Sequence, residues 1–221
     1  MVTLITGVLL MAATAGPTEV HFTAPDGGVV YADLYGTSVR GVVLAHGARF
    51  DKASWSKEAT EIAEAGFRVL AIDFRGYGQS HGGPNAKPGM DEMYMDVLAA
   101  VRYLREHGAT SVAVIGASMG GGASANAVVH GRPGEIDRLV LLSPAPIEAP
   151  ERVTGPKLII TAADDPITPK VREQYAKEPD PKRLEVLDGS AHAQFLFRTP
   201  HRHRIMEEFV SFLGGRLTAA H

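Results

Sequence analysis

The stretch Gly116-Ala117-Ser118-Met119-Gly120 follows an apolar run at residues 112–115, and it decides the fold prediction. The β-branched residues of that run are typical of a buried strand, and the small residues at 123–130 fit a helix. A Gly-x-Ser-x-Gly sequence between a strand and a helix forces a sharp turn that pushes the serine oxygen outward. We therefore predict that Ser118 is exposed at this turn as a candidate nucleophile.

The same pattern occurs a second time, at Gly78-Gln79-Ser80-His81-Gly82. This copy leads into residues 82–89, where glycine and proline predict a loop and no helix. The strand–turn–helix context is therefore missing around Ser80, and we do not expect Ser80 to be a nucleophile.

The composition is that of an ordinary globular enzyme. The chain has 221 residues, of which 45% are hydrophobic and 21% charged, which favours one domain with a substantial core. A net charge of -3 gives no sign of nucleic-acid binding or of attraction to an acidic membrane. The chain contains no cysteine, which excludes disulfides, thiolate metal sites and cysteine nucleophiles.

The first sixteen residues form an apolar segment ahead of the predicted domain at residues 17–221. The segment is too short to span a bilayer, so we expect no stable membrane insertion. Small residues at 13–15 resemble a cleavage site, although no Lys or Arg precedes Arg40. We interpret residues 1–16 as a short export signal, which predicts a secreted or periplasmic protein. The alternative is an apolar segment packed on a cytoplasmic domain.

The order of the remaining segments predicts an α/β fold. Alternation around a turn at residues 25–28 predicts an antiparallel hairpin over residues 19–35. Strands that alternate with helices then predict a mostly parallel sheet with helices on both faces. The expected strands are residues 41–45, 67–72, 112–115, 136–142, 157–162 and 183–187, and the expected helices are residues 55–65, 90–107, 123–130, 170–177 and 200–213.

A serine nucleophile needs a base, and His192 is the best candidate. In this topology the chain order is serine, acid and histidine, each in a loop after a strand. His192 follows the last predicted strand, whereas His46 precedes the serine. His201 and His203 alternate with arginines at a helix start, which favours a solvated face over a metal site.

The acid of such a triad is expected after the strand at residues 157–162. Asp164 and Asp165 both stand there, followed by Pro166. Adjacent side chains diverge, so both are not expected to reach the same imidazole. The residues alone leave the choice between them open.

Acyl transfer also needs hydrogen-bond donors for the oxyanion of the tetrahedral intermediate. The backbone N–H of Met119, directly after the nucleophile, opens the helix and points into the site. A second N–H is expected from the loop after the strand at residues 41–45. Ala48, which follows His46 and Gly47, is the best candidate.

Taken together, the chain from about residue 20 to 213 resembles the α/β-hydrolase superfamily, and within it the small lidless serine esterases and dienelactone-hydrolase-like members. The resemblance implies that Asp165 is the triad acid, with Asp164 as the fallback, and that Ser80 ends a structural loop. Dienelactone hydrolases proper use cysteine, which this chain lacks. The matching motifs are His46-Gly47-Ala48, residues 73–80, residues 116–120, residues 165–169 and His192.

Family members often insert a helical cap between the strands that correspond to residues 136–142 and 157–162. Here only residues 144–155 lie between them, so we expect an open site that accepts small substrates. Aromatic residues near the predicted site could line a small apolar pocket with Met119, or could equally be core residues. They are Phe50, Trp55, Phe195 and Phe197. Arg49 could meet an anionic substrate group, although a solvated arginine is the commoner case.

The resemblance implies a serine hydrolase that cleaves small carboxylic esters through an acyl-enzyme, without a cofactor or metal. The expected partner is a small-molecule ester, with no nucleic acid. The alternatives are the same triad acting on thioesters, lactones or amides, or in perhydrolysis, and a non-catalytic binding protein with this fold. The sequence leaves the oligomeric state open.

Overall fold

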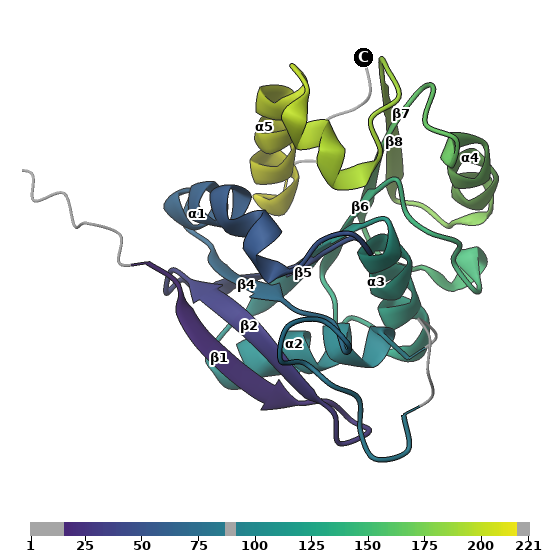
Figure 1. The fold of residues 1–221 in the computed structure, drawn as a ribbon. Coiled ribbons are helices and arrows are strands. Elements are labelled where there is room, and N and C mark those ends of the chain that lie inside the picture. Colours follow the sequence, from purple (N-terminus) through teal and green to yellow (C-terminus); the bar gives the residue numbers. More distant parts are fainter. Residues whose placement is uncertain (1–15, 87–91, 216–221) are drawn as a thin grey trace, which may run out of the picture.

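A computed structural model describes residues 16–86 and 92–215. Its centre is an eight-stranded sheet of order β1-β2-β4-β3-β5-β6-β7-β8 (Figure 1). Strands β3 to β8 are parallel, as predicted, and the hairpin β1–β2 adds two antiparallel strands at one edge. The strands are β1 (Thr18–Thr23), β2 (Val29–Tyr35), β3 (Arg40–Ala45), β4 (Arg68–Ile72), β5 (Ser111–Ala117), β6 (Arg138–Leu142), β7 (Lys157–Ala162) and β8 (Lys182–Leu187).

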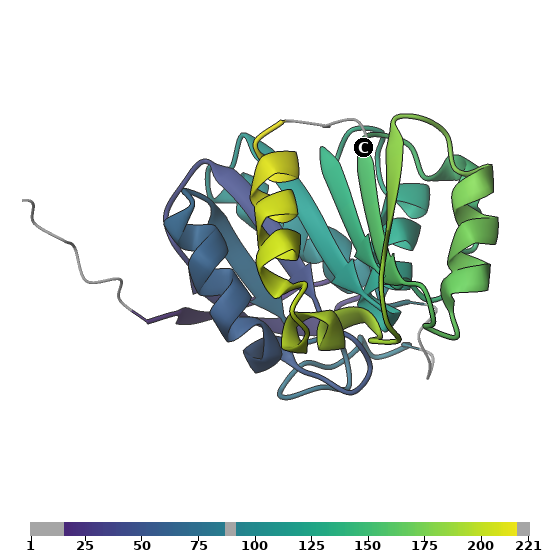
Figure 2. The same cartoon turned by 90° about the horizontal axis from the view of Figure 1, so that it is seen from above.

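Helices cover both faces of the sheet (Figure 2). Helices α1 (Ser56–Glu64) and α5 (Arg202–Leu213) pack on one face, and α2 (Tyr94–Glu106), α3 (Met119–His130) and α4 (Thr168–Lys177) pack on the other. Three short 3₁₀ helices complete the elements: η1 (Lys52–Trp55), η2 (Pro150–Arg152) and η3 (Ala193–Arg198). The predicted α/β architecture is confirmed.

The strands of the sheet are buried on both faces because successive side chains point in opposite directions. In β3, Val42 and Leu44 join the core beneath α1 and α5, whereas Val43 and Ala45 join the core beneath α2 and α3. This explains why the central strands are continuous apolar runs in the sequence, without the alternation of the hairpin.

Several element boundaries differ from the prediction. Helix α3 begins at Met119, directly after the sharp turn, although the helical pattern was expected only from residue 123. Helix α2 begins at Tyr94; the expected start at residue 90 lies outside the described residues. Between β6 and β7 the chain forms only η2 and irregular structure, and none of the described residues forms a helical cap there.

The predicted export signal at residues 1–16 lies, except for its last residue, outside the part of the chain that the structure describes. Within residues 16–86 and 92–215, none of the helices has both the length and the apolar character that crossing a membrane requires.

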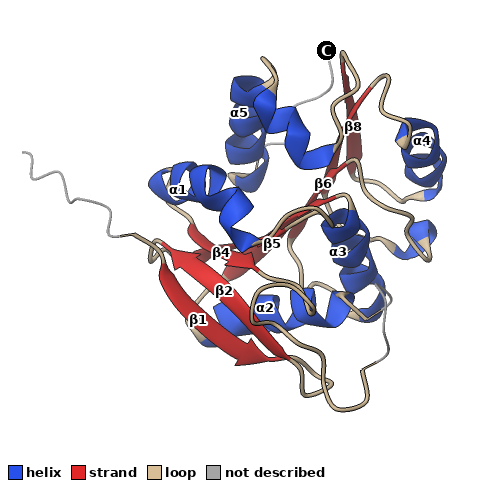
Figure 3. Cartoon of the chain, viewed as in Figure 1, coloured by secondary structure: helices blue, strands red, loops and turns tan. Residues whose placement is uncertain are grey.

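Strand β3 sits between β4 and β5, so the chain leaves β3 toward one side of the sheet and later returns to its other side. Figure 3 shows the strands of the sheet with helices on either side of them. The loops after β3 and β5 lie at this switch point, at the carboxyl ends of the strands, where open α/β sheets bind ligands. The residues predicted to carry chemistry follow β3, β5, β7 and β8, all at this edge.

Candidate active site

The turn between β5 and α3 holds Ser118, which is half-buried, in a strained backbone conformation. Ser118 has φ 49° and ψ -113°, a conformation that L side chains rarely adopt. Gly116 and Gly120 permit the turn: a Cβ on Gly116 would lie 2.4 Å from the Gly120 carbonyl oxygen, and one on Gly120 would lie 2.3 Å from that of Ala45. The Gly-x-Ser-x-Gly spacing is thus required by close backbone approach.

One imidazole connects Ser118 to a carboxylate. His192 Nε2 lies 2.8 Å from Ser118 Oγ, and His192 Nδ1 lies 2.8 Å from Asp165 Oδ2. Because the carboxylate can only accept, Nδ1 carries the hydrogen and Nε2 is free to accept the serine proton. The side chain of Asp165 is 2% exposed, so water does not compete for this contact. The structure therefore brings together the three residues that the sequence singled out as a triad.

The two adjacent aspartates have different environments. Asp165 is buried, and its second oxygen, Oδ1, accepts from the backbone N–H of Ile167 at 3.2 Å. Asp164 is exposed, and its backbone N–H donates to the Gly189 carbonyl at 2.9 Å. Only Asp165 contacts His192, so the geometry selects it over the fallback.

Two backbone N–H groups border the serine. Met119 begins α3 directly after Ser118, where the helix dipole places partial positive charge. The loop after β3 passes beside the nucleophile: a Cβ on Gly47 would lie 3.5 Å from Ser118 Cβ. Within the described residues, the N–H groups of Met119 and Ala48 have no acceptor, which leaves both available to a ligand oxygen.

His46 holds the loop after β3 and sets the direction of the Ala48 N–H. The Phe74 N–H donates to His46 Nε2 at 3.2 Å, so the hydrogen sits on Nδ1, which donates to the Gly47 carbonyl at 2.9 Å. The Phe50 N–H donates to the same carbonyl at 3.0 Å. In a planar trans peptide the carbonyl and the following N–H point in opposite directions, so fixing this carbonyl also fixes the Ala48 N–H.

The His46 ring is fully buried, and burial lowers its pKa, so the ring stays neutral. Neutrality is essential to its contacts. A proton on Nε2 would face the Phe74 N–H, and two donors would then point at each other.

Tyr77 also supports this loop. Its hydroxyl donates to the Ala48 carbonyl at 2.9 Å and lies 3.7 Å from Met119 Sδ, while its ring packs edge-on against His46 at 4.6 Å. Tyr77 therefore links the two segments that carry the candidate oxyanion donors.

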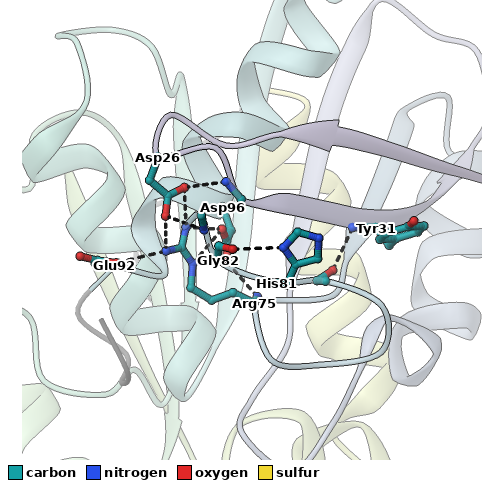
Figure 4. A network of polar contacts seen from close by, with 10 residues as sticks. Asp26, Tyr31, Arg75, His81, Gly82, Glu92 and Asp96 are labelled. Carbon is teal, nitrogen blue, oxygen red and sulfur yellow. Dashed lines mark hydrogen bonds and ion pairs between the residues drawn. The ribbon is translucent and has the colours of Figure 1, made fainter. Parts of the chain in front are cut away.

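A buried ion network anchors the segment that carries Tyr77 (Figure 4). The guanidinium of Arg75 donates to Asp96 at 2.8 Å, to Asp26 at 2.8 Å and to Glu92 at 3.3 Å. Arg75 and Asp96 are 5% and 0% exposed, and the contacts join the hairpin turn and α2 to the loop after β4. This network is structural support behind the site, outside the reacting groups.

The four aromatic residues proposed to line a pocket fall into two groups. Trp55 is fully buried beneath α1, and Phe197 packs edge-on against it at 5.7 Å and on the same core. Of the two interpretations that the sequence left open for Trp55, the structure supports the core residue. Phe50 and Phe195 are half-buried and contact each other at 5.1 Å, joining the loop after β3 to the segment after His192.

The other singled-out residues lie away from the triad's contacts. Ser80 is buried, and its hydroxyl accepts from the Tyr31 N–H at 2.9 Å, as expected of a structural loop. His203 is exposed beside Glu207, and His201 contacts the Asp188 carbonyl. Arg49 is exposed. Among the described residues, no three His, Asp or Glu side chains are grouped to hold a metal ion.

Sequence reasoning missed three supporting residues: Gln194, Tyr77 and Asp96. Gln194 Oε1 accepts from the Gly47 N–H at 2.8 Å, across 147 positions of sequence. A contact this remote leaves no local pattern. Asp96 carried one detectable signal, a charge on the buried face of a predicted helix.

The fold and the arrangement of residues at the carboxyl ends of its strands define the class of α/β-hydrolases. A family model described as serine aminopeptidase, S33, matches residues 37–151, just over half of the chain. The chain belongs to this family of hydrolases, within the α/β-hydrolase superfamily.

Curated relatives are similar at modest identity. The rat putative protein-lysine deacylase ABHD14B is 30% identical over 186 residues, which cover 80% of this chain and 87% of that protein. A non-heme chloroperoxidase of Streptomyces lividans is 35% identical over 105 residues, or 48% of this chain and 37% of that protein. Four of the curated relatives, this chloroperoxidase included, are matched over only 14% to 43% of their own lengths.

Solved structures share the fold. An esterase of Pyrococcus furiosus, Pf2001, superposes with a TM-score of 0.75 at 20% identity, covering 90% of each chain. A protein from Thermoplasma acidophilum, described as a predicted CIB-like hydrolase, gives a TM-score of 0.73 at 23% identity, covering 91% of this chain and 99% of that one. At these identities the likeness shows the α/β-hydrolase fold alone.

Proposed function

We propose that this hydrolase cleaves small carboxylic esters through an acyl-enzyme on Ser118. The observation that carries the proposal is the position of the His192 ring, 2.8 Å from both Ser118 Oγ and Asp165 Oδ2. A serine hydroxyl becomes an effective nucleophile when a positioned imidazole takes its proton.

The reaction follows from this geometry. Ser118 Oγ attacks the ester carbonyl as His192 Nε2 takes the hydroxyl proton, and Asp165 stabilises the imidazolium. The N–H groups of Met119 and Ala48 donate to the oxyanion of the tetrahedral intermediate. His192 returns the proton to the leaving alcohol, which leaves an acyl group on Ser118. A water molecule, deprotonated by His192, then attacks the acyl group. As the bond to Ser118 Oγ breaks, His192 gives that proton to Ser118 Oγ, which releases the carboxylic acid and restores the free serine. Besides the ester and water, the groups used are the side chains of Ser118, His192 and Asp165 and the two backbone N–H groups.

The size of the substrate follows from the open edge of the sheet. Within the described residues, the chain between β6 and β7 contributes only η2 and irregular structure, with no helical cap to enclose a long acyl chain. The half-buried pair Phe50–Phe195 offers a limited apolar surface next to the loops that carry Ala48 and His192. We therefore propose short acyl groups as the preferred substrates.

A series of p-nitrophenyl esters, from acetyl to long acyl chains, tests this function on the wild type and Ser118→Ala. We expect the wild type to favour the short esters and Ser118→Ala to lose activity by about 10³-fold or more. Ser80→Ala is the matched control, because Ser80 stands in the second copy of the motif, and it should retain the wild-type kcat. Equal rates in the wild type and Ser118→Ala would contradict the proposal and favour a non-catalytic protein. A strong preference for long acyl chains would contradict the open site.

A second candidate is the same triad acting on other acyl compounds or in perhydrolysis. The names of the relatives favour it: one is a putative protein-lysine deacylase, and two are a non-heme chloroperoxidase and a non-heme haloperoxidase. Thioester, lactone and N-acyl-lysine substrates, and halide oxidation with peroxide and acetate, belong in the same assay. A higher kcat/KM for any of these than for short esters would make it the principal activity.

A further inference from the structure

The buried amide of Gln194 joins three separate parts of the site. Gln194 lies two residues after His192 and is 5% exposed. Its Oε1 accepts from the Gly47 N–H at 2.8 Å, and its Nε2 donates to Ser54 Oγ at 2.8 Å. One side chain thus connects the segment that carries the histidine to both ends of residues 47–54.

The direction of each hydrogen bond fixes the orientation of the amide. A backbone N–H can only donate, so the atom that faces Gly47 is the side-chain oxygen. The Ser54 hydroxyl donates its own hydrogen to the Asp51 carbonyl and so accepts from the Gln194 Nε2 group. All the hydrogen bonds therefore run in one direction. If the amide were flipped, its Nε2 group would face the Gly47 N–H, and two donors would point at each other.

The orientation of Gly47 affects the proposed oxyanion donor, because the Gly47 carbonyl and the Ala48 N–H belong to the same planar peptide group. The Gly47 carbonyl is held by His46 and Phe50, as described above, whereas its N–H has Gln194 as its acceptor. Both backbone polar groups of Gly47 are therefore hydrogen-bonded. These contacts fix the residue, which has no side chain that could do so. Removal of the Gln194 oxygen would leave the Gly47 N–H buried without an acceptor, so the loop would have to shift to regain one.

The backbone between His192 and Gln194 is constrained in the same way. Ala193 has φ 49°, an uncommon conformation for a residue with a Cβ, and it turns the chain so that Gln194 points toward the loop after β3. Strained backbone at a functional site persists only where the surroundings hold it. The two hydrogen bonds of the Gln194 amide provide such a hold.

We propose that Gln194 is a positioning residue for the oxyanion: it locks the loop that carries the Ala48 N–H to the segment that carries His192. The inference rests on the function proposed above and deepens it. Gln194 does not touch the reacting atoms. It keeps the donor and the base in a fixed relation, so its loss weakens binding of the transition state more than binding of the ester.

Gln194→Met tests the proposal, because methionine keeps the length and burial of the side chain and removes its acceptor oxygen. We expect kcat for p-nitrophenyl acetate to fall by about 10- to 100-fold, less than the 10²- to 10³-fold typical of deleting a donor outright, with KM little changed. Affinity for a small alkyl boronic acid, which forms a tetrahedral adduct on a serine, should weaken by a similar factor. Gln194→Glu keeps an acceptor for the Gly47 N–H. In the neutral form that burial favours, its O–H also donates to Ser54 Oγ, so this variant should restore most of both.

A wild-type measurement covers the case in which Gln194→Met does not fold. The Gly47 amide should exchange its hydrogen slowly, as expected of a buried bonded N–H; rapid exchange would overturn the proposal. With folded variants, unchanged kcat and boronate affinity in Gln194→Met would overturn it, as would equal losses in Gln194→Met and Gln194→Glu. These results differ from failure of the proposed function, which would appear as wild-type activity independent of Ser118 and would remove the inference with it.

Discussion

Ser118 and His192 stand 74 positions apart in the chain, yet the Oγ of one lies 2.8 Å from the Nε2 of the other. Local structure holds each of the two side chains in position. Ser118 is fixed by the strained turn that begins α3, and His192 is fixed by its contact with the buried Asp165. The fold therefore places the proposed base and nucleophile in hydrogen-bond contact, an arrangement that would lower the reorganisation needed for attack.

The two neighbouring aspartates provide a matched pair of variants. Asp165→Asn should lower kcat by about 10³- to 10⁴-fold, because an amide at this position favours the wrong tautomer of His192 and cannot stabilise the imidazolium. Asp164→Asn should change kcat less than about threefold, because Asp164 is exposed and its side chain does not contact His192. Such a change corresponds to less than about 1 kcal/mol in the activation free energy. Steady-state kinetics on a p-nitrophenyl ester measure both. A greater loss in Asp164→Asn would contradict the assignment.

Gly120 should not tolerate a side chain. A Cβ there would lie 2.3 Å from the Ala45 carbonyl oxygen and 2.6 Å from that of His46, so Gly120→Ala forces β3 and the nucleophile turn apart. We expect a loss of about 2 kcal/mol or more in the free energy of unfolding, measured by urea denaturation.

Gly122→Ala is the control for that substitution, because it lies in the same helix and its Cβ would meet nothing closer than 3.2 Å. It should change the free energy of unfolding by no more than about 1 kcal/mol in either direction. If Gly120→Ala and Gly122→Ala lower the free energy of unfolding equally, the close backbone contact at Gly120 is not the reason for its glycine.

Removal of Arg75 should destabilise the fold strongly. Arg75→Met leaves Asp96 as a fully buried carboxylate without its guanidinium, and such a loss typically costs about 3–5 kcal/mol. Lys177→Met breaks an exposed pair with Glu173 and should have little effect, because water screens it. Denaturant titration of both variants checks the difference. A loss in Arg75→Met as small as that in Lys177→Met would contradict the anchoring role of the network.

The buried His46 predicts a pH dependence of stability. Burial lowers its pKa in the folded protein, so as the pH falls below about 6.5 the unfolded chain takes up a proton that the native ring does not. The free energy of unfolding that His46 contributes is therefore present above that pH and is lost toward acid, by at most about 1.4 kcal/mol per pH unit.

His46→Gln isolates this effect, because the other histidines are common to both proteins. The stability difference between wild type and variant, measured by denaturation at about pH 8 and pH 5, should shrink at the lower pH. A difference that stays constant, or grows toward acid, would contradict a neutral buried His46.

Local patterns sufficed for the strands, the hairpin and the turn at Ser118, because each depends on residues close in sequence. The order of Ser118, an aspartate and His192 followed from topology. The choice of Asp165 over Asp164 needed either a family resemblance or the direction of the two side chains, which the sequence does not contain. The sequence left open whether Trp55 lines a pocket or fills the core, because an apolar side chain near a site and one in the core look the same in a sequence.

Gln194 shows where sequence reasoning ends. Its polar side chain gave no sign of burial, and its partners Gly47 and Ser54 lie 147 and 140 positions away. The same holds for Arg75, whose partners stand on the hairpin turn and on α2. Such contacts depend on the assembled fold, and only the three-dimensional structure reveals them.

The central claim is that Ser118 carries the acyl group during turnover. The most direct measurement is peptide mass spectrometry after rapid acid quench of the enzyme reacting with p-nitrophenyl acetate. The account predicts one acetyl group on the peptide that contains Ser118, its persistence in Ser80→Ala and its absence in Ser118→Ala. An acetyl group on any other residue during turnover, or turnover that continues unchanged in Ser118→Ala, would contradict the account.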